Sequence, residues 1–107
     1  MKTIHFICKD SQHLSRIEKG KDDYTCGNWD LSKADSDKLV GGMIYLHQTK
    51  ARPSYFGGKV LSVKEIQTKD HDKRIVFTFT FAPECRGVAW QGTGRATAWT
   101  SGLLDHE

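Results

Sequence analysis

Residues 41–66 read GGMIYLHQTKARPSYFGGKVLSVKEI, and this stretch decides the fold. It places two apolar strands, at 43–48 and 57–66, around a loop rich in basic and aromatic residues. The first strand carries apolar side chains on both faces, which is typical of a central strand. The second strand breaks strict alternation, which indicates a β-bulge or the bend of a barrel.

Another strand is predicted at 74–82, where Ile75, Phe77 and Phe79 alternate with smaller or polar residues. This period of two predicts that the aromatic side chains face the core. A further strand is expected at 3–8, because the residues there are mostly β-branched or aromatic.

Helical structure is expected in two short segments. Residues 10–19 contain two apolar side chains at helical spacing and end before a glycine. Ser32 is followed three residues later by Asp35, a capping-box pattern that predicts a helical turn over 33–38. The other expected segments are a loop at 22–28, a polar turn at 67–73 and a last strand at 95–100.

The order of these elements favours an α+β domain, built as a small, strongly curved β-barrel with short flanking helices. A chain of 107 residues can bury one compact core, so residues 1–107 are expected to form a single domain. Strand alternation predicts that the buried residues include Ile44, Leu46, Phe77 and Phe79.

Composition excludes several classes of protein. Hydrophobic residues make up 37% of the chain, which is too many for a disordered protein. No segment approaches the roughly 18 to 20 apolar residues of a membrane span, and the N-terminus lacks a secretory core. We therefore expect a cytoplasmic protein with no membrane partner. Cys8, Cys26 and Cys85 show no metal-ligand spacing and no pairing pattern, so they are expected to be buried thiols.

Catalytic and cofactor fingerprints are absent from the sequence. It contains no nucleophile elbow, Walker loop, zincin motif or dinucleotide-binding glycine pattern. No catalytic residue, metal ion or cofactor is therefore predicted. His47, at the end of a strand, is a candidate general base, and a histidine hydrogen-bonded to the backbone is an equal alternative.

Aromatic residues in loop positions suggest a ligand site. Trp29 is expected in a polar turn, and Phe56 lies between a loop and a glycine pair. Stacking contributes about 1 to 3 kcal/mol per base, so two such rings, with hydrogen bonds from Asn28, Ser32 or His47, would suffice to read one base. The alternative is that these rings plug the mouth of the barrel.

Three segments together resemble a known family. Residues 29–32 (WDLS), the strand 43–47 (MIYLH) and the stretch 56–65 (FGGKVLSVKE) are similar to the EVE and ASCH branch of the PUA-like superfamily. The resemblance implies a curled β-barrel whose aromatic pocket binds a nucleobase, often a modified one, with Trp29, Ser32, His47 and Phe56 at the pocket. Gly42 and Asp30 depart from the family pattern, which has aspartate and glycine there.

The leading functional hypothesis is recognition of a nucleobase in RNA or DNA. Lys50, Arg52 and Lys59 would bind phosphates, a role that positions nucleic acid without reading its sequence. One alternative is a small hydrolase of nucleotides or RNA phosphodiesters with His47 as the base. Another is a ligand- or protein-interaction module without a nucleic-acid role.

Overall fold

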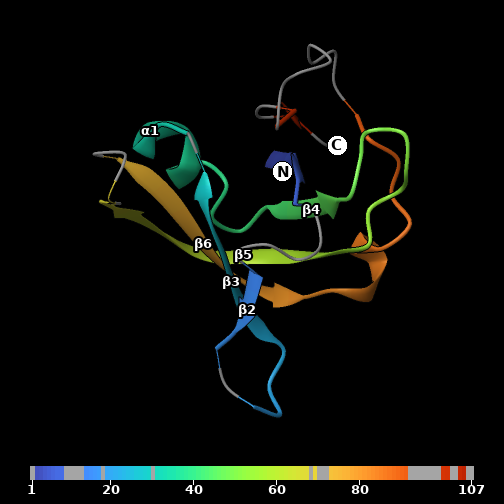
Figure 1. Ribbon diagram of the computed structural model, residues 1–107, viewed down its shortest axis with the longest axis horizontal. Coiled ribbons are helices and arrows are strands. Elements are labelled where there is room, and N and C mark those ends of the chain that lie inside the picture. The colour runs from blue at the N-terminus through green and yellow to red at the C-terminus, as the bar shows by residue number, and fades with distance from the viewer. Residues whose placement is uncertain are drawn as a thin grey trace.

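The computed structural model describes residues 2–8, 14–17, 19–29, 31–67, 69, 73–91, 100–101 and 104–105, without the side chains of Asn28 and Asp105. The described strands form one sheet with the order β2-β3-β6-β5-β4-β1-β7 (Figure 1). The elements in chain order are β1 (Lys2–Ile7), β2 (Leu14–Arg16), β3 (Asp23–Trp29), α1 (Lys33–Asp37), β4 (Met43–His47), β5 (Phe56–Ile66), β6 (Arg74–Phe81), the 3-10 turn η2 (Pro83–Cys85) and β7 (Leu104–Asp105).

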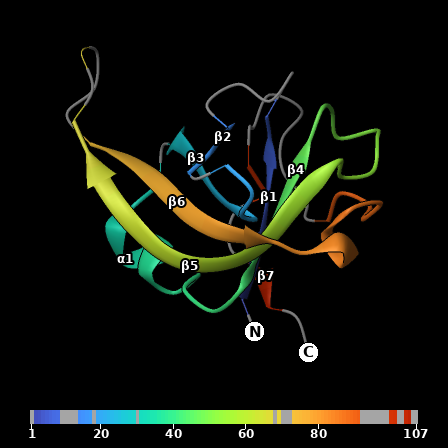
Figure 2. The same cartoon turned by 90° about the horizontal axis from the view of Figure 1, so that it is seen from below.

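The sheet is strongly curled, and its two longest strands carry the bend. Figure 2 shows β5 and β6 as a long curved pair that sweeps under the other strands. The pairing of β5 with β6 shifts register between Val60 and Ser62, which confirms the predicted bulge. All described strand pairs are antiparallel except β1 with β4, which is parallel.

The described strands form an open sheet and not the closed barrel that the sequence predicts. The short strands β2 and β7 are its two edges and do not pair with each other. The curl nevertheless brings β1 over β3, because the rings of Phe6 and Trp29 stack at 4.0 Å between centroids. The result is a small, sheet-dominated fold in which α1 is the one α-helix among the described residues.

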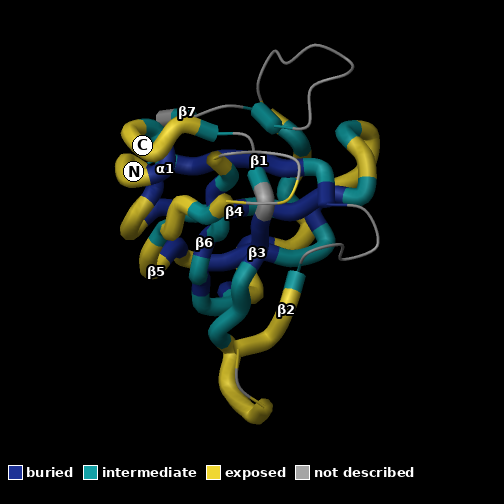
Figure 3. Tube along the Cα trace, turned by 60° about the vertical axis from the view of Figure 1, so that its left-hand side comes forward, coloured by how far each residue is buried: buried dark blue, intermediate teal, exposed yellow. Residues whose placement is uncertain are grey.

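The hydrophobic core fills the concave side of this curl. Ile44, Leu46, Phe77 and Phe79 are all fully buried, which confirms the prediction from strand alternation. Figure 3 shows β1 and β4 as largely buried strands and the tip between β2 and β3 as exposed. The other fully buried apolar side chains of the core include Ile4, Phe6, Cys26, Leu39, Val60 and Ile75.

The helical turn at 33–38 is confirmed, whereas the helix expected at 10–19 is wrong where the structure describes it. In α1, the Ser32 hydroxyl accepts a hydrogen bond from the Asp35 amide at 3.1 Å. Residues 14–16 instead form the edge strand β2, paired with β3. Two apolar residues at helical spacing are a weak signal, and strand pairing outweighs it.

The segment expected as a loop at 22–28 is strand β3. Tyr24 and Cys26 pair with Phe79 and Phe77 of β6, so both turn toward the core. Polar residues alternate with them on the other face, so the composition of this segment resembles that of a loop.

Two further expectations fall mostly outside the described residues. Of the strand expected at 95–100, Thr100 alone is described, and it forms an isolated bridge with Phe6. The polar turn at 67–73 is described only at its ends and at Lys69. Within the described part of the chain, no helix is long and apolar enough to cross a membrane.

Candidate functional site

The candidate site lies on the face of β1 and β4 that points away from the hydrophobic core. These strands are parallel neighbours, with His5 opposite Tyr45. Successive side chains alternate between the faces of a strand, so His5 shares this outer face with Tyr45 and His47. Parallel strands are normally covered on both faces. Here the second cover includes Ser101, which exchanges hydrogen bonds with the His5 backbone, and Trp90.

Two histidines form the centre of this face. Nδ1 of His5 lies 2.7 Å from Nε2 of His47, and Nδ1 of His47 lies 3.0 Å from the carbonyl oxygen of Arg52. A carbonyl can only accept a hydrogen bond, so Nδ1 of His47 carries the hydrogen and its Nε2 is the acceptor. Nδ1 of His5 must then donate. This order assigns one tautomer to each neutral ring and leaves the lone pair of His5 on Nε2.

Burial keeps both imidazoles neutral. The pKa of His5 is lowered to about 4, first because burial disfavours the charged ring and second because a charge on His47 would repel it. The pKa of His47 is also lowered by burial, and its hydrogen bond to Arg52 offsets part of that effect. The side chains are 1% and 0% exposed. Near pH 7 both imidazoles are therefore uncharged, and they form a polar surface against which the neighbouring rings pack.

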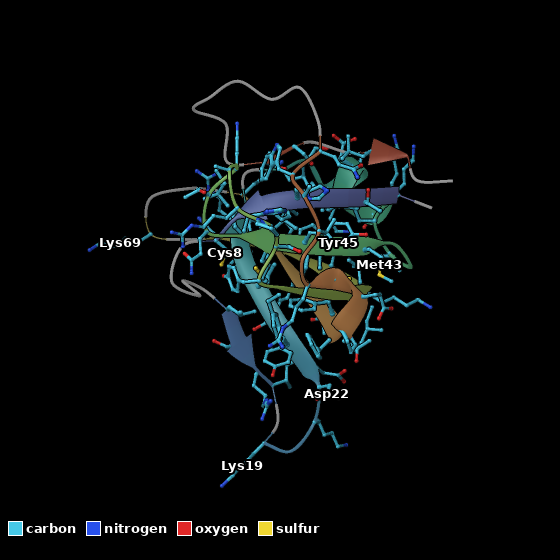
Figure 4. The ribbon with its side chains drawn as sticks, turned by 90° about the vertical axis from the view of Figure 1, so that its right-hand side faces the viewer. Cys8, Lys19, Asp22, Met43, Tyr45 and Lys69 are labelled. Atoms are coloured by element: carbon cyan, nitrogen blue, oxygen red, sulfur yellow. The ribbon has the colours of Figure 1, made fainter. Side chains whose placement is uncertain are left out.

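Aromatic rings surround the histidine pair. Tyr45 stacks on His5 with 4.6 Å between ring centroids (its place on β4 is labelled in Figure 4). The Trp90 ring lies 5.6 Å from His5 and 5.1 Å, edge-on, from His47. Nζ of Lys50 lies 5.3 Å from the centroid of Trp90, within the range of a cation–π contact. Tyr45 and Trp90 are only partly buried, so this cluster reaches the protein surface.

Ser54 fixes the segment that carries Trp90. The Ser54 amide donates to the carbonyl of Val88 at 2.8 Å, and its carbonyl accepts from the amide of Gly87 at 2.8 Å. The hydroxyl donates to the carbonyl of Cys85 and accepts from the amide of Val88. These four bonds hold the loop before β5 against the segment after η2, and thereby place the indole beside the histidines.

Basic residues flank this face. Lys50 and Arg52 lie in the loop after β4, and the Arg52 side chain is exposed. Lys59 is exposed and pairs with Met43, so it shares the outer face of the sheet with Tyr45. Of the three residues predicted to bind phosphate, Lys50 and Lys59 therefore lie on this side of the sheet, and Arg52 contacts it through its carbonyl oxygen. Glu84 is also near, because its charge contributes, after burial and Cys85, to the raised pKa of Tyr45.

Trp29 does not belong to this face, although the sequence placed it in a turn at the ligand pocket. It is the last residue of β3, pairs with buried Ile75 and stacks on Phe6 in the core. His47 lies on the opposite face of the sheet from Phe6. The structure therefore separates Trp29 from His47, because β3 continues through the residues that looked like a polar turn.

Phe56 also turns toward the core side. It pairs with Leu46, stacks on Phe81 at 4.7 Å and meets Tyr24 edge-on at 4.8 Å. The guanidinium of Arg86 lies 5.9 Å from its ring centroid. Phe56 is thus part of an aromatic cluster at the rim of the core and is not beside His47.

The remaining predicted ligand residues lie apart from the histidine pair. Ser32 is exposed and caps α1. Asn28 is in β3, and its side chain lies outside the described residues. Of the five predicted ligand-binding residues, the structure places His47 on the outer face of β1 and β4.

Sequence reasoning did not assign His5 or Trp90 to a site. His5 alternates with Ile4 and Phe6 in β1, so its position on the outer face could be read from the sequence. Its partner could not, because the parallel pairing of β1 with β4 joins segments far apart in the chain. Trp90 follows an irregular stretch with no period, and hydrogen bonds to Ser54 determine where that stretch runs.

Comparisons of this chain with protein-family models, with curated proteins and with solved structures give no match. Among the described residues there is no group of three or more histidine, cysteine or acidic side chains that could hold a metal ion. Function is therefore inferred from the geometry of the histidine and tryptophan cluster.

Proposed function

We propose that the protein is a nucleic-acid-binding module that recognises a nucleobase by stacking on Trp90. One observation carries this proposal. A half-buried indole is supported by two buried, neutral imidazoles and has the ammonium group of Lys50 over its ring. This arrangement provides a supported aromatic platform with a positive charge over its ring, which suits a flat base joined to a phosphate.

The interaction energies favour replacement of the Lys50 ammonium over Trp90 by a stacked base. A cation–π contact at an exposed site contributes about 0.5 to 1 kcal/mol. Stacking of a base on an aromatic side chain contributes about 1 to 3 kcal/mol. A base that displaces the ammonium of Lys50 from Trp90 would therefore gain energy, and the displaced ammonium could bind the adjoining phosphate.

The basic residues extend the surface along the nucleic acid. Lys50 lies over Trp90, the Arg52 carbonyl accepts from His47, and Lys59 is on the outer face of β5, so all three could contribute phosphate contacts beside the stacked base. Such contacts weaken steeply as salt rises, because they release condensed counterions. Selectivity then comes from the stacked base, while phosphate contacts supply general affinity.

The histidine geometry supports binding more than hydrolysis. Nδ1 of His47 donates to a carbonyl, and its Nε2 accepts from His5. Both ring nitrogens are thus engaged, and the side chain is fully buried, so His47 is poorly placed to remove a proton from a nucleophile. With regard to fold, we propose that the curled, open sheet is related to the PUA-like barrel suggested by residues 29–65.

Fluorescence anisotropy with labelled single-stranded RNA and DNA tests the proposal, using oligonucleotides that each carry one standard or modified base. Trp90→Ala should weaken binding to the preferred base about tenfold, the loss expected from one stacking contact. Trp90→Phe should retain part of that affinity. Lys50→Glu should weaken binding to every oligonucleotide and reduce its salt dependence.

Lys64→Glu is the matched control, because Lys64 is an exposed lysine toward the far end of β5. It should bind almost as the wild type does. The proposal is wrong if the wild-type protein binds no oligonucleotide at low salt, or if Trp90→Ala binds all of them as tightly as wild type. Circular dichroism confirms that each variant is folded.

A further inference from the structure

Arg86, directly after η2, is an exposed arginine whose guanidinium is held in place by three contacts. The guanidinium carbon lies 5.1 Å from the ring centroid of Phe81 and 5.9 Å from that of Phe56. These two rings stack on each other, with 4.7 Å between their centroids. Nε of Arg86 also donates a hydrogen bond to the carbonyl of Tyr55 at 3.2 Å. The guanidinium is therefore positioned by an aromatic pair and a backbone carbonyl before any ligand binds.

The other end of this guanidinium has donors that the fold does not use. Within the part of the chain that the structure describes, the side chain of Arg86 makes no hydrogen bond except the one from Nε, and it has no carboxylate partner. The ion pairs described there are those of α1 and its C-terminal end, Lys33–Asp37 and Lys38–Asp35. The two Nη atoms thus keep their N–H groups, which form a planar fork that matches two oxygens of a phosphate.

The backbone at Arg86 is anchored by the contacts that also place Trp90. The amide of Arg86 donates to the carbonyl of Pro83 at 3.1 Å, and the amide of Gly87 donates to the carbonyl of Ser54 at 2.8 Å. Figures 1 and 2 both show the loop between β4 and β5 beside the segment after η2. Trp90 follows Arg86 by four residues, so their Cα atoms are separated by at most about 14 Å.

The two side chains lie against different faces of the sheet. The Arg86 guanidinium contacts Phe56 and Phe81, which turn toward the core side, whereas the Trp90 ring lies beside the outer-face histidines. The segment that joins them therefore passes around one end of the sheet. A ligand that contacts both side chains must extend along this segment, which a single nucleotide stacked on Trp90 does not do.

We propose that Arg86 binds a phosphate of the nucleotide next to the one stacked on Trp90, so that the site takes a single strand in preference to a free nucleotide. This inference rests on the function proposed for Trp90. The aromatic support lowers the side-chain entropy lost on binding, because the guanidinium is already held in place. A phosphate contact carries no sequence information, so Arg86 adds affinity and length dependence without changing which base is preferred.

Arg16 provides a matched control for a substitution at Arg86. It is also exposed, its guanidinium carbon lies 5.3 Å from the ring centroid of Tyr24, and it donates to the Tyr24 hydroxyl. It lies on the edge strand β2, which β3, β6 and β5 separate from β4 in the sheet. Arg16→Gln thus removes the same charge from a similar aromatic support, away from the segment that carries Trp90.

Competition against a labelled oligonucleotide tests the inference with adenosine 5′-monophosphate and oligoadenylates of two, four and eight nucleotides. The wild-type protein should bind the tetranucleotide about tenfold more tightly than the monophosphate. Arg86→Gln should lose most of this gain and bind the monophosphate as wild type does. The slope of log K against log salt for the tetranucleotide should fall by about 0.7, the value for one phosphate contact on a single strand. Arg86→Lys should keep the salt slope and recover only part of the affinity, and Arg16→Gln should match wild type.

The inference is overturned if Arg86→Gln binds the tetranucleotide with the affinity and salt slope of wild type. It is equally overturned if Arg86→Gln weakens the monophosphate and the tetranucleotide by the same factor, because the arginine then acts on the base site or on the fold. Trp90→Ala distinguishes this failure from that of the proposed function. If Trp90→Ala weakens binding and Arg86→Gln does not, only the inference at Arg86 fails. If the wild-type protein binds no oligoadenylate at low salt, both fail.

Discussion

The buried histidine pair makes the stability of the fold depend on pH. In the folded protein the pKa of His5 is about 4, whereas a histidine in an unfolded chain titrates near about 6.5. Between these two pH values the unfolded state binds a proton that the folded state does not. Acidification therefore favours unfolding. The stability due to neutral His5 is complete above the unfolded pKa and is lost as the pH falls toward 4.

The size of the effect follows from the shift. In this window His5 changes the free energy of unfolding by about 1.4 kcal/mol per pH unit. His5 alone should remove about 2 kcal/mol between pH 6.5 and pH 5, and His47, whose pKa is also lowered, acts in the same direction. Domains are stable by only about 5 to 15 kcal/mol, so the loss should be easily measured.

Urea unfolding followed by tryptophan fluorescence, at several pH values between 4.5 and 7.5 and at constant ionic strength, measures this dependence. The comparison is with His5→Asn, whose amide can still donate toward His47 but does not titrate. The variant should be less stable than wild type at pH 7, and the difference should shrink by about 2 kcal/mol at pH 5. Titrating groups that do not contact residue 5 cancel in this difference. If the two stability curves run parallel between pH 6.5 and pH 5, His5 is not a buried neutral imidazole and the tautomer assignment is wrong.

Two core substitutions test the packing. Phe79→Ala should lower the free energy of unfolding by about 3 to 5 kcal/mol, because the side chain is fully buried, and an unchanged urea midpoint would contradict this placement. Gly58→Ala should be severely destabilising, because a Cβ there would lie 1.9 Å from the carbonyl oxygen of Thr80 and would push β5 from β6. Gly41→Ala is its control, since φ is +86° there and no atom lies within 4 Å of the added carbon, so the cost should be about 1 kcal/mol. Equal melting temperatures for the two glycine variants would rule out the close contact between β5 and β6.

Local sequence patterns correctly predicted those elements whose pattern lies entirely within the element itself. The alternation in 74–82 identifies β6 because its period of two directly reflects burial of Phe77 and Phe79. The Ser32 cap identifies α1 for a similar reason, because the hydrogen bond joins residues three apart. The bulge in β5 was visible as a break in alternation.

Segments whose structure depends on a distant partner were predicted wrongly. β2 and β3 looked like a helix and a loop, yet pairing with β6 makes β3 a strand, and pairing with β3 makes residues 14–16 another. The expectation that Trp29 lies in a polar turn fails for the same reason. Its neighbours are polar in sequence, but its contacts are Ile75 and Phe6.

By itself, the sequence determined the strands around residues 41–66, the helix cap, the buried Phe77 and Phe79, and the position of His47 at the end of a strand, just before a loop with basic residues. Each of these follows from spacing within a few residues. Tertiary structure alone decided that His5 meets His47 and that Trp90 lies beside both rings. These contacts join strands and loops far apart in the chain, and they exist because the sheet curls and because β1 lies parallel to β4. No local period encodes either of those arrangements.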